Sequence, residues 1–309
     1  MQENSESVIL EEQLQEQHEG KRRKPWIAFL LSLITPGLGQ VYNGQIKKGA
    51  LFLGLLFIPL LLASMINLVH TFNGFVVLAV IELSLRLYII VDSIKVAKQQ
   101  DDFVPRSYNR WYYHLVFAIA VLTILQLFPA HSILRVHSFK ISTDSNIPVL
   151  ETNDMAVADM TAYRNRKPEY GELVAFNSPQ GGVCTFRVVG LPGDKIYYDG
   201  SFLSINNKKC RVEDLGERLV EGWPLKQYIE ELPNGFKHQI FLYNGDDRGK
   251  RETRSLTVPP HSYYLMGDSR DNALDSRFIG PIAAPDILGR FLYTYWGRSF
   301  DRINVDLTK

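Results

Sequence analysis

The chain has 309 residues, 46% of them hydrophobic, and carries 34 basic and 33 acidic residues, for a formal net charge of +1. This balance argues against a nucleic-acid partner, because nucleic-acid-binding proteins concentrate positive charge. The apolar residues concentrate between Pro25 and Pro129, and a chain of this length accommodates a membrane domain and one soluble domain. We therefore predict a cytoplasmic tail at 1–24, a membrane domain at 25–131 and a separate domain at 132–309.

The start of the membrane domain is apolar but interrupted. Before it, the polar residues 1–20 predict a disordered tail or a frayed helix. Residues 25–42 are broken by a Pro-Gly-Leu-Gly run, and both flanks are basic. We predict one interfacial or re-entrant helix here, rather than a span or a cleaved signal peptide. Residues 36–49, PGLGQVYNGQIKKG, resemble the small two-helix TM2-type membrane domain, in which a Gly/Tyr/Gly pattern precedes two helices that end near an aspartate, here Asp92.

Three apolar stretches are long enough to cross a bilayer as helices. They lie at about 49–69, 74–93 and 112–130. The second contains Glu82 and Arg86, four residues apart on one helix face. Ionisable residues inside a span are costly unless they are paired, so we predict an interior ion pair between them. A contact with a ligand or a partner is the alternative.

The distribution of Lys and Arg predicts the orientation of these spans. Basic residues precede the first span and separate the second from the third, at Lys21, Arg22, Arg23, Lys24, Lys47, Lys48, Lys95, Lys98, Arg106 and Arg110. The link at 70–73 has no Lys or Arg. The basic segments are therefore expected in the cytoplasm and the chain after Phe128 outside, with the aromatic residues at 111–113 as an interfacial belt.

After residue 132 the pattern changes to short β-like runs. Asp199-Gly200, between two such runs, predicts a hairpin, and the weak alternation at 173–176 predicts a strand buried on both faces. Helical periodicity occurs only near 225–232, within a predicted inserted segment at about 210–255. The sequence therefore predicts one β-rich domain.

The two cysteines, Cys184 and Cys210, both fall in this outer domain. An oxidising compartment would permit a disulfide between them, and free buried thiols are the alternative.

The sequence has no metal-ligand spacing and no phosphate-binding Gly loop, so we expect no metal site and no cofactor.

The most informative motif is GDSRDNALDSRFIGPI at 267–282. Its Asp and Arg residues alternate at spacings that allow several ion pairs to fix one loop shape, and a solvated loop with Asx turns is the alternative. The motif resembles the G-D-x-R-D-N-S-x-D-S-R-x-x-G pattern of type I signal peptidases, membrane serine endopeptidases that remove signal peptides. RVVGLPGD at 187–194 and KPEYGELVAF at 167–176 resemble two further blocks of that family. The resemblance extends over about 139–294.

The resemblance implies a fold, a location and a substrate class. The fold is a membrane protein with an α-helical N-terminal part, here three spans plus one interfacial helix, followed by a mostly antiparallel β domain with an apolar surface that rests on the lipid bilayer. The location is the cytoplasmic (inner) membrane of a bacterium, with a multi-pass chain and an extracytoplasmic C-terminal domain. The substrates are exported preproteins or their signal peptides, cut after small residues.

The resemblance also assigns roles to individual residues. TDSNIPVL at 143–150 aligns with the nucleophile segment S-G-S-M-x-P-T-L, so Ser145 would be the nucleophile and Thr143 an oxyanion donor. Five residues would form the supporting scaffold: Arg187, Asp268, Arg270, Asp275 and Arg277.

The chain departs from the family pattern at two positions that belong to the catalytic site. The family's general base is a Lys directly before the Arg of R-V-V-G, and this chain has Phe186 there. The Ser that orients this Lys is Ala273. A serine needs a neighbour to take its proton, so we predict an inactive or severely impaired serine endopeptidase, a possible pseudoenzyme. The alternative is a non-catalytic membrane protein that binds signal peptides or membrane partners.

Three ionisable residues near Ser145 in sequence are the candidates for a substitute base. On an extended strand, Asp144 and Lys140 would point away from the face that carries Ser145, and His137 would share that face but lie far along the strand. We therefore expect all three to be surface residues.

Overall fold

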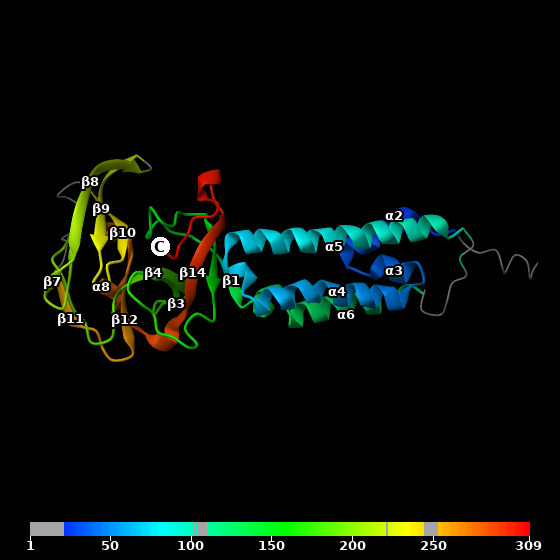
Figure 1. Cartoon of the computed structure of the whole chain (residues 1–309), viewed down its shortest axis with the longest axis horizontal. Coiled ribbons are helices and arrows are strands. Elements are labelled where there is room, and N and C mark those ends of the chain that lie inside the picture. The colour runs from blue at the N-terminus through cyan, green and yellow to red at the C-terminus, as the bar shows by residue number, and fades with distance from the viewer. Residues whose placement is uncertain (1–21, 102, 104–109, 221, 244–252) are drawn as a thin grey trace, which may run out of the picture. The chain divides into compact units, whose positions relative to one another are not determined.

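The computed structural model describes residues 22–101, 103, 110–220, 222–243 and 253–309 (Figure 1). The predicted tail at 1–20 lies outside these residues. The chain divides into two units. We call Met1–Val69 with Asn73–Leu134 the helical unit, and His70–Phe72 with Arg135–Lys309 the β unit.

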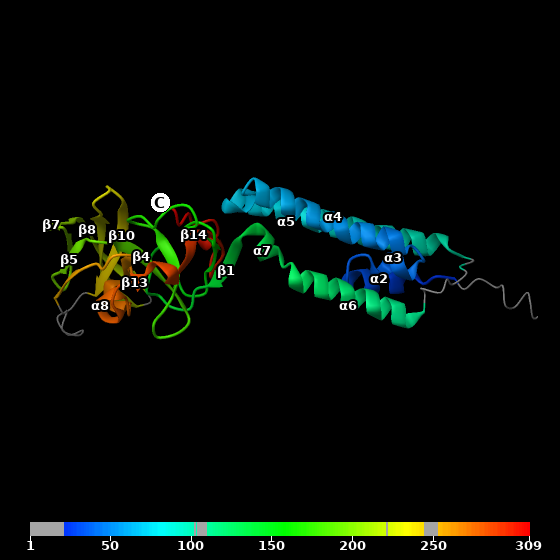
Figure 2. The same cartoon turned by 90° about the horizontal axis from the view of Figure 1, so that it is seen from below.

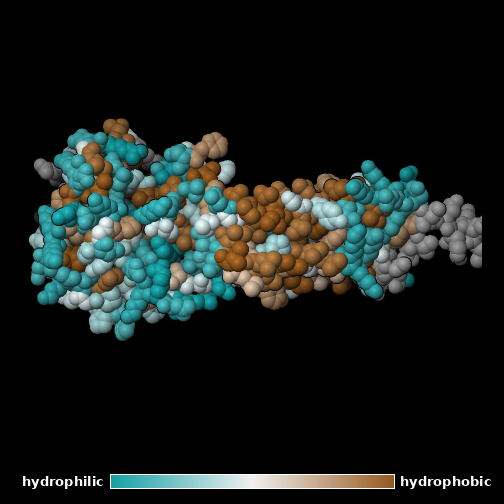
Figure 3. Space-filling model, viewed as in Figure 1, coloured by the Kyte–Doolittle hydropathy of each residue, from teal (hydrophilic) through white to brown (hydrophobic). Residues whose placement is uncertain are grey.

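The helical unit contains three helical segments that are long and apolar enough to cross a membrane, among the residues described. They are α4 (Ile46–Met65), α5 (Phe72–Gln99) and the segment Trp111–Leu134, which comprises α6 (Trp111–Leu127) and α7 (Ala130–Leu134). Their outward surface is predominantly hydrophobic (Figure 3). The predicted number of long apolar helices is confirmed, and their insertion in a membrane remains a prediction.

The prediction of one helix at 25–42 is wrong, because the apolar segment before α4 forms two short helices, α2 (Pro25–Ile34) and α3 (Leu38–Tyr42). The break falls at the predicted Pro-Gly run, because Gly37 adopts a φ of 89°, which an L residue rarely accepts. A Cβ atom on Gly37 would lie 2.4 Å from Gly49 O, so only a glycine allows α3 to approach α4 this closely. Figure 2 shows α2 and α3 between α6 and the α4–α5 pair.

Polar side chains hold this pair of short helices against α4 and α5. Gln40 donates a hydrogen bond to Ile89 O (2.7 Å) and another to Asp92 (3.2 Å), and Lys48 Nζ lies 2.6 Å from Asp92 Oδ1. Residues of the TM2-like motif thus meet the aspartate near the end of α5. The interfacial or re-entrant position of this segment remains a prediction.

The predicted ion pair between Glu82 and Arg86 is wrong. The structure contains no ion pair between these two described residues: Glu82 Oε1 is buried without a hydrogen-bond partner, and Arg86 is exposed. The buried stripe of α5, which includes Leu78 and Ile89, packs inward. Glu82 is half-buried, four residues after Leu78, whereas Arg86 is exposed. The spacing of four residues permits the pair but does not enforce it.

The described strands of the β unit form three sheets, and every pairing between strands is antiparallel. In spatial order, the seven-stranded sheet consists of β1 (Val136–Lys140), β2 (Met155–Asp159), β14 (Ile287–Trp296), β3 (Leu173–Asn177), β4 (Val183–Gly190), β12 (Ser262–Met266) and β13 (Ile282–Ala283). The three-stranded sheet consists of β10 (Lys237–Tyr243), β9 (Trp223–Glu231) and β8 (Arg211–Val220). The four-stranded sheet consists of β11 (Arg254–Thr257), β5 (Lys195–Tyr198), β6 (Leu203–Ile205) and β7 (Lys208–Lys209).

Two local predictions for the β unit are confirmed and one is wrong. The hairpin at Asp199-Gly200 joins β5 to β6, and β3 is buried on both faces from Leu173 to Phe176. The helical interpretation of 225–232 is wrong, because residues 225–231 lie in β9. Strand β9 pairs with β8 on one side and β10 on the other, and the hydrogen bonds of these two ladders outweigh its local periodicity.

Cys184 and Cys210 are free thiols, which agrees with the alternative rather than with a disulfide. They pack into different apolar clusters, Cys184 with Phe186 and Val188, and Cys210 with Val189 and Ile196. Burial raises the pKa of the Cys210 thiol to about 12, so this residue is a poor nucleophile.

Candidate functional site

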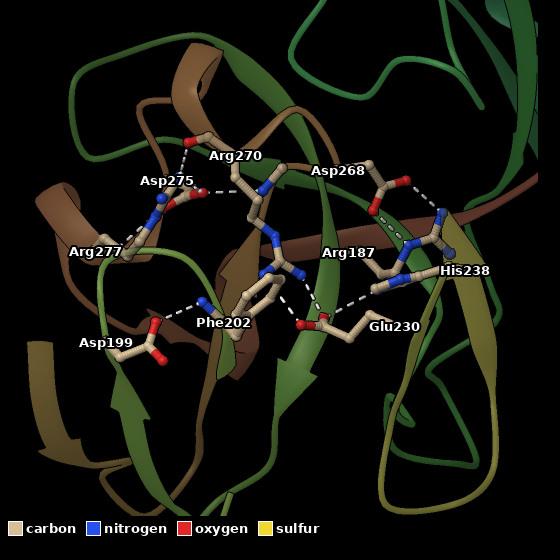
Figure 4. Close-up of polar contacts among 10 residues, drawn as sticks. Arg187, Asp199, Phe202, Glu230, His238, Asp268, Arg270, Asp275 and Arg277 are labelled. Atoms are coloured by element: carbon tan, nitrogen blue, oxygen red, sulfur yellow. Dashed lines mark hydrogen bonds and ion pairs between the residues drawn. The ribbon is translucent and has the colours of Figure 1, made fainter. Parts of the chain in front are cut away.

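The centre of the β unit is a buried ion pair between β4 and the loop after β12 (Figure 4). Arg187 Nε and Nη2 donate to the two carboxylate oxygens of Asp268 at 2.8 and 2.6 Å, and neither side chain is exposed. Arg187 Nη1 donates to Gly171 O at 2.6 Å. This bidentate geometry fixes the direction in which the 267–282 loop leaves the sheet.

A second buried pair joins the same loop to the three-stranded sheet. Arg270 donates to both carboxylate oxygens of Glu230 on β9. His238 on β10 lies beside this pair, with its Nε2 3.4 Å from Glu230 Oε2 (Figure 4). Burial, together with the charges of Arg187 and Arg270, holds the pKa of His238 well below its ordinary value, so this imidazole is neutral.

A third pair lies within the loop itself. Arg277 Nε and Nη2 donate to Asp275 at 2.8 Å each, and Arg277 also donates to Arg270 O (Figure 4). Asp275 Oδ2 accepts a hydrogen bond from Gly267 N at 3.0 Å. The polar motif is therefore not a solvated loop, because four of its charged side chains are buried and form ion pairs that hold one backbone shape: Asp268, Arg270, Asp275 and Arg277.

Ser145 lies against this loop. Its Oγ donates to Asn272 O at 2.9 Å, and its carbonyl oxygen accepts from Ser269 N at 3.0 Å. The neighbouring Asn146 is buried and donates to Thr185 O on β4 at 2.7 Å. These contacts place Ser145 between β4 and the 267–282 loop, 127 residues away from Asn272 in sequence.

The segment that carries Ser145 is held from its other side by Arg302. This buried arginine pairs with Asp154 and donates to Val149 O at 2.8 Å and to Pro148 O at 3.3 Å. Two backbone oxygens after Ser145 therefore have a fixed position. The sequence contains no local signal for this contact, because Arg302 lies 154 residues after Pro148 and 153 after Val149.

Phe186 and Ala273 meet beside Ser145. A Cβ atom on Gly267 would lie 2.4 Å from Ala273 Cβ, 2.6 Å from Ser145 O and 3.4 Å from Phe186 Cε1. Phe186 and Ala273 belong to one apolar cluster, and the Phe186 ring packs 5.7 Å from the ring of Phe176. The positions that resemble the family's base and its orienting hydroxyl are thus brought together next to the serine, and both carry apolar side chains.

None of the three substitute bases has a contact with Ser145 Oγ among the described residues. His137 and Lys140 are exposed on β1, which is the edge strand of the seven-stranded sheet, with three strands between it and β4. Asp144 Oδ1 accepts a hydrogen bond from Thr152 N at 2.8 Å. The assumption of an extended strand fails after Lys140, because residues 145–149 form turns.

Two further residues bear on the predicted site, one predicted from the sequence and one not. Thr143 is exposed, two residues before Ser145, and its role as an oxyanion donor remains a prediction. Sequence reasoning missed Glu230, which pairs with Arg270 across 40 residues. An acidic residue on a strand looks like a solvated one, and the motif already contains Asp residues that could pair with Arg270, so the sequence held no signal for this partner.

Comparisons with known proteins identify the family of this chain. The sequence profile described as "Signal peptidase, peptidase S26" matches residues 109–296, more than half of the chain. Signal peptidase I of Buchnera aphidicola is 25% identical over 252 residues, which cover 64% of this chain and 79% of that protein. Signal peptidase I of Bacillus caldolyticus is 26% identical over 188 residues, covering 61% and 90%. Signal peptidase I of Rickettsia typhi is 32% identical over 159 residues, covering 46% and 60%. The chain belongs to the signal peptidase family, peptidase S26.

Proposed function

We propose that this chain is a signal peptidase I homologue of the bacterial cytoplasmic membrane whose endopeptidase reaction on exported preproteins is absent or severely impaired. The observation that carries the proposal is the side chain next to Ser145. Phe186 is buried with Ala273 in an apolar cluster at the place where the family's lysine and its orienting serine are expected. A phenyl ring accepts no proton.

The contact made by Ser145 supports the same conclusion. Its hydroxyl donates to the neutral carbonyl of Asn272. A carbonyl oxygen accepts a hydrogen bond but is far too weak a base to remove the proton, so the hydroxyl is held in place without being activated. The loss of a general base costs about 10²–10⁴-fold in rate.

A second function is favoured by what remains intact. Arg187, Asp268, Asp275 and Arg277 keep the loop beside Ser145 in one shape through buried ion pairs. A protein that retains this scaffold without the base is suited to hold a signal peptide rather than to cut it. We therefore propose signal-peptide binding as the alternative function of the same site.

The test of the first proposal uses the full chain in detergent or liposomes, with a preprotein whose cleavage is followed on a gel. The wild-type protein and Ser145→Ala are expected to cleave equally slowly. Phe186→Lys combined with Ala273→Ser is expected to gain cleavage, because burial in this cluster would keep the new amine neutral. Adding Ser145→Ala to that double variant should remove the gain.

Two results discriminate between explanations. If the double variant folds but stays inactive, Asp144 and Asn146 are the next positions to restore, because both flank Ser145 and both depart from the family pattern. Robust wild-type cleavage that Ser145→Ala abolishes would overturn the proposal, since a base would then act from elsewhere in the chain.

A further inference from the structure

A pocket of about 270 Å³ adjoins Ser145 in the β unit. It lies between the turn that follows Ser145 and one face of the three-stranded sheet. Its lining consists of Asp144, Ile147, Pro148, Glu151, Arg218, Val220, Trp223, Leu225, Phe241, Tyr243, Asn272 and Arg298. The carbonyl oxygen of Asn272 accepts the hydrogen bond from the Ser145 hydroxyl. The pocket therefore lies directly next to Ser145.

The sheet contributes alternate residues, as expected when one face of a sheet forms a wall. Arg218 and Val220 of β8 line the pocket and pair across the ladder with Leu225 and Trp223 of β9, which also line it. Leu219, between the two β8 residues, is 74% exposed and is not part of the wall.

The floor of the pocket is apolar. Ile147, Leu225 and Phe241 form a buried cluster that joins the turn after Ser145 to β9 and β10. This cluster is separate from the one that contains Phe186 and Ala273. At the mouth, Trp223 remains 52% exposed and offers a large apolar surface to anything that enters.

The size of the pocket identifies the side chain that fits it. On the same measure of volume, a cavity that holds one water molecule needs about 10–15 Å³, so the pocket volume of about 270 Å³ is many times larger than a methyl group requires. An aromatic or large aliphatic side chain would gain most from the apolar floor, because the gain grows with the apolar area removed from water. Charged residues of both signs surround the floor, so the rim does not favour a ligand of one charge.

We propose that this pocket binds one bulky apolar or aromatic side chain of a peptide whose backbone lies at Ser145. The inference rests on the proposed function, because it assumes that a peptide occupies the serine site. The family resemblance implies small residues at the cleavage position. The pocket adds a second requirement, for a bulky residue close to the small one.

The test measures binding of dye-labelled ten-residue peptides to the full chain in detergent micelles by fluorescence anisotropy. The reference peptide contains only Ala and Ser, and each further peptide carries one Leu or Trp at a different position. At one position, Leu or Trp is expected to lower the Kd about ten-fold relative to the reference. Micelles without protein correct for partition of the peptides into detergent.

A matched pair of variants assigns the effect to the pocket. Val220→Trp places an indole in the pocket and should abolish the preference for the bulky residue. Leu219→Trp adds the same indole on the opposite face of the same strand and should leave the preference unchanged. A peptide carrying benzoylphenylalanine at the preferred position should crosslink to the segment 218–225 or to 147–148.

The outcomes separate this inference from the function on which it rests. If all peptides bind with the same Kd, or if Leu219→Trp and Val220→Trp behave alike, the pocket is not a side-chain site and only this inference fails. If no peptide binds at all, including the reference, peptide binding at Ser145 fails and the inference fails with it.

Discussion

The guanidinium of Arg187 binds both carboxylate oxygens of Asp268, at 2.8 and 2.6 Å, while both side chains are completely or almost completely buried. This pair joins the middle of a core strand to the loop that touches Ser145. A buried charge without its partner is strongly destabilising, because neither water nor another ion replaces the lost contact. The geometry around Ser145 therefore depends on a contact that takes no part in any reaction.

Arg187→Met is expected to destabilise the β unit by about 3–5 kcal/mol, because Asp268 would stay buried without its partner. The measurement is the thermal unfolding of the full chain in detergent, followed by tryptophan fluorescence. Lys237→Met is the matched control, since Lys237 forms an exposed pair with Glu231 at 3.9 Å, and such pairs contribute about 1 kcal/mol or less. Equal losses in the two variants would contradict the prediction.

His238 is expected to make the protein less stable as the pH falls below about 6.5. Its pKa is well below the ordinary value in the folded state, because it is buried near Arg187 and Arg270. The unfolded chain then takes up a proton that the folded chain does not, so stability falls by up to about 1.4 kcal/mol per pH unit. This loss starts near the unfolded pKa and continues down to the folded one.

His238→Gln should reduce the pH dependence of the unfolding temperature between pH 7 and pH 5.5. His137→Gln makes the same replacement at an exposed histidine on β1 and is the matched control. If the slope is the same for the wild-type protein and His238→Gln, another group is responsible for the pH dependence.

Gly267→Ala is expected to destabilise the β unit by about 1–3 kcal/mol through overpacking. The added methyl group would lie 2.4 Å from Ala273 Cβ and 2.6 Å from Ser145 O. Adding Ala273→Gly removes the first of these clashes and should recover part of the unfolding temperature. No recovery in the double variant would mean that Gly267 and Ala273 are not neighbours.

The orientation of the chain is a separate prediction. A reporter that is active only outside the cytoplasm, fused after Lys309, is expected to be active, whereas the same reporter fused after Lys98 is expected to be inactive. A second reporter that is active only in the cytoplasm should give the opposite pattern at both fusion points. Cytoplasmic activity after Lys309 would overturn the topology.

Several helices and turns could be predicted from the sequence because the patterns that determine them are local. Apolar length predicted α4, α5 and α6, the Pro-Gly run predicted the break before Leu38, and the Asp-Gly pair predicted the β5–β6 hairpin. The motif at 267–282 also predicted ion pairs, and Arg277 pairs with Asp275 inside it. In each of these cases, the residues that determine the structure lie within one short segment. The partners of Asp268 and Arg270, by contrast, lie outside the motif.

The sequence failed where the partner of a residue is distant. The apolar spacing of Leu225, Ile229 and Leu232 fits a helix, but two neighbouring strands supply hydrogen bonds that a single sequence does not show. Glu230 is buried because Arg270 is opposite it, and nothing near Glu230 indicates this. The predicted pair of Glu82 and Arg86 also fails, because a spacing of four residues permits an ion pair but does not enforce it.

The proximity of Phe186 and Ala273 to Ser145 was predictable in part, although the three residues are distant in sequence. The family resemblance predicted that the altered positions belong to one site, and the structure brings them together around Gly267. The pocket next to them was not predictable, because its walls come from a turn and from three strands that pair only in the folded chain.

The peptide group between Asp268 and Ser269 connects two parts of the β unit. Its carbonyl oxygen accepts from Phe241 N of β10 at 2.9 Å, and its N–H donates to Ser145 O at 3.0 Å. A peptide group is planar and resists twisting, so one rigid unit links β10 of the three-stranded sheet to the backbone of Ser145. We therefore expect hydrogen exchange at the amides of Phe241 and Ser269 to change together when a substitution weakens either contact.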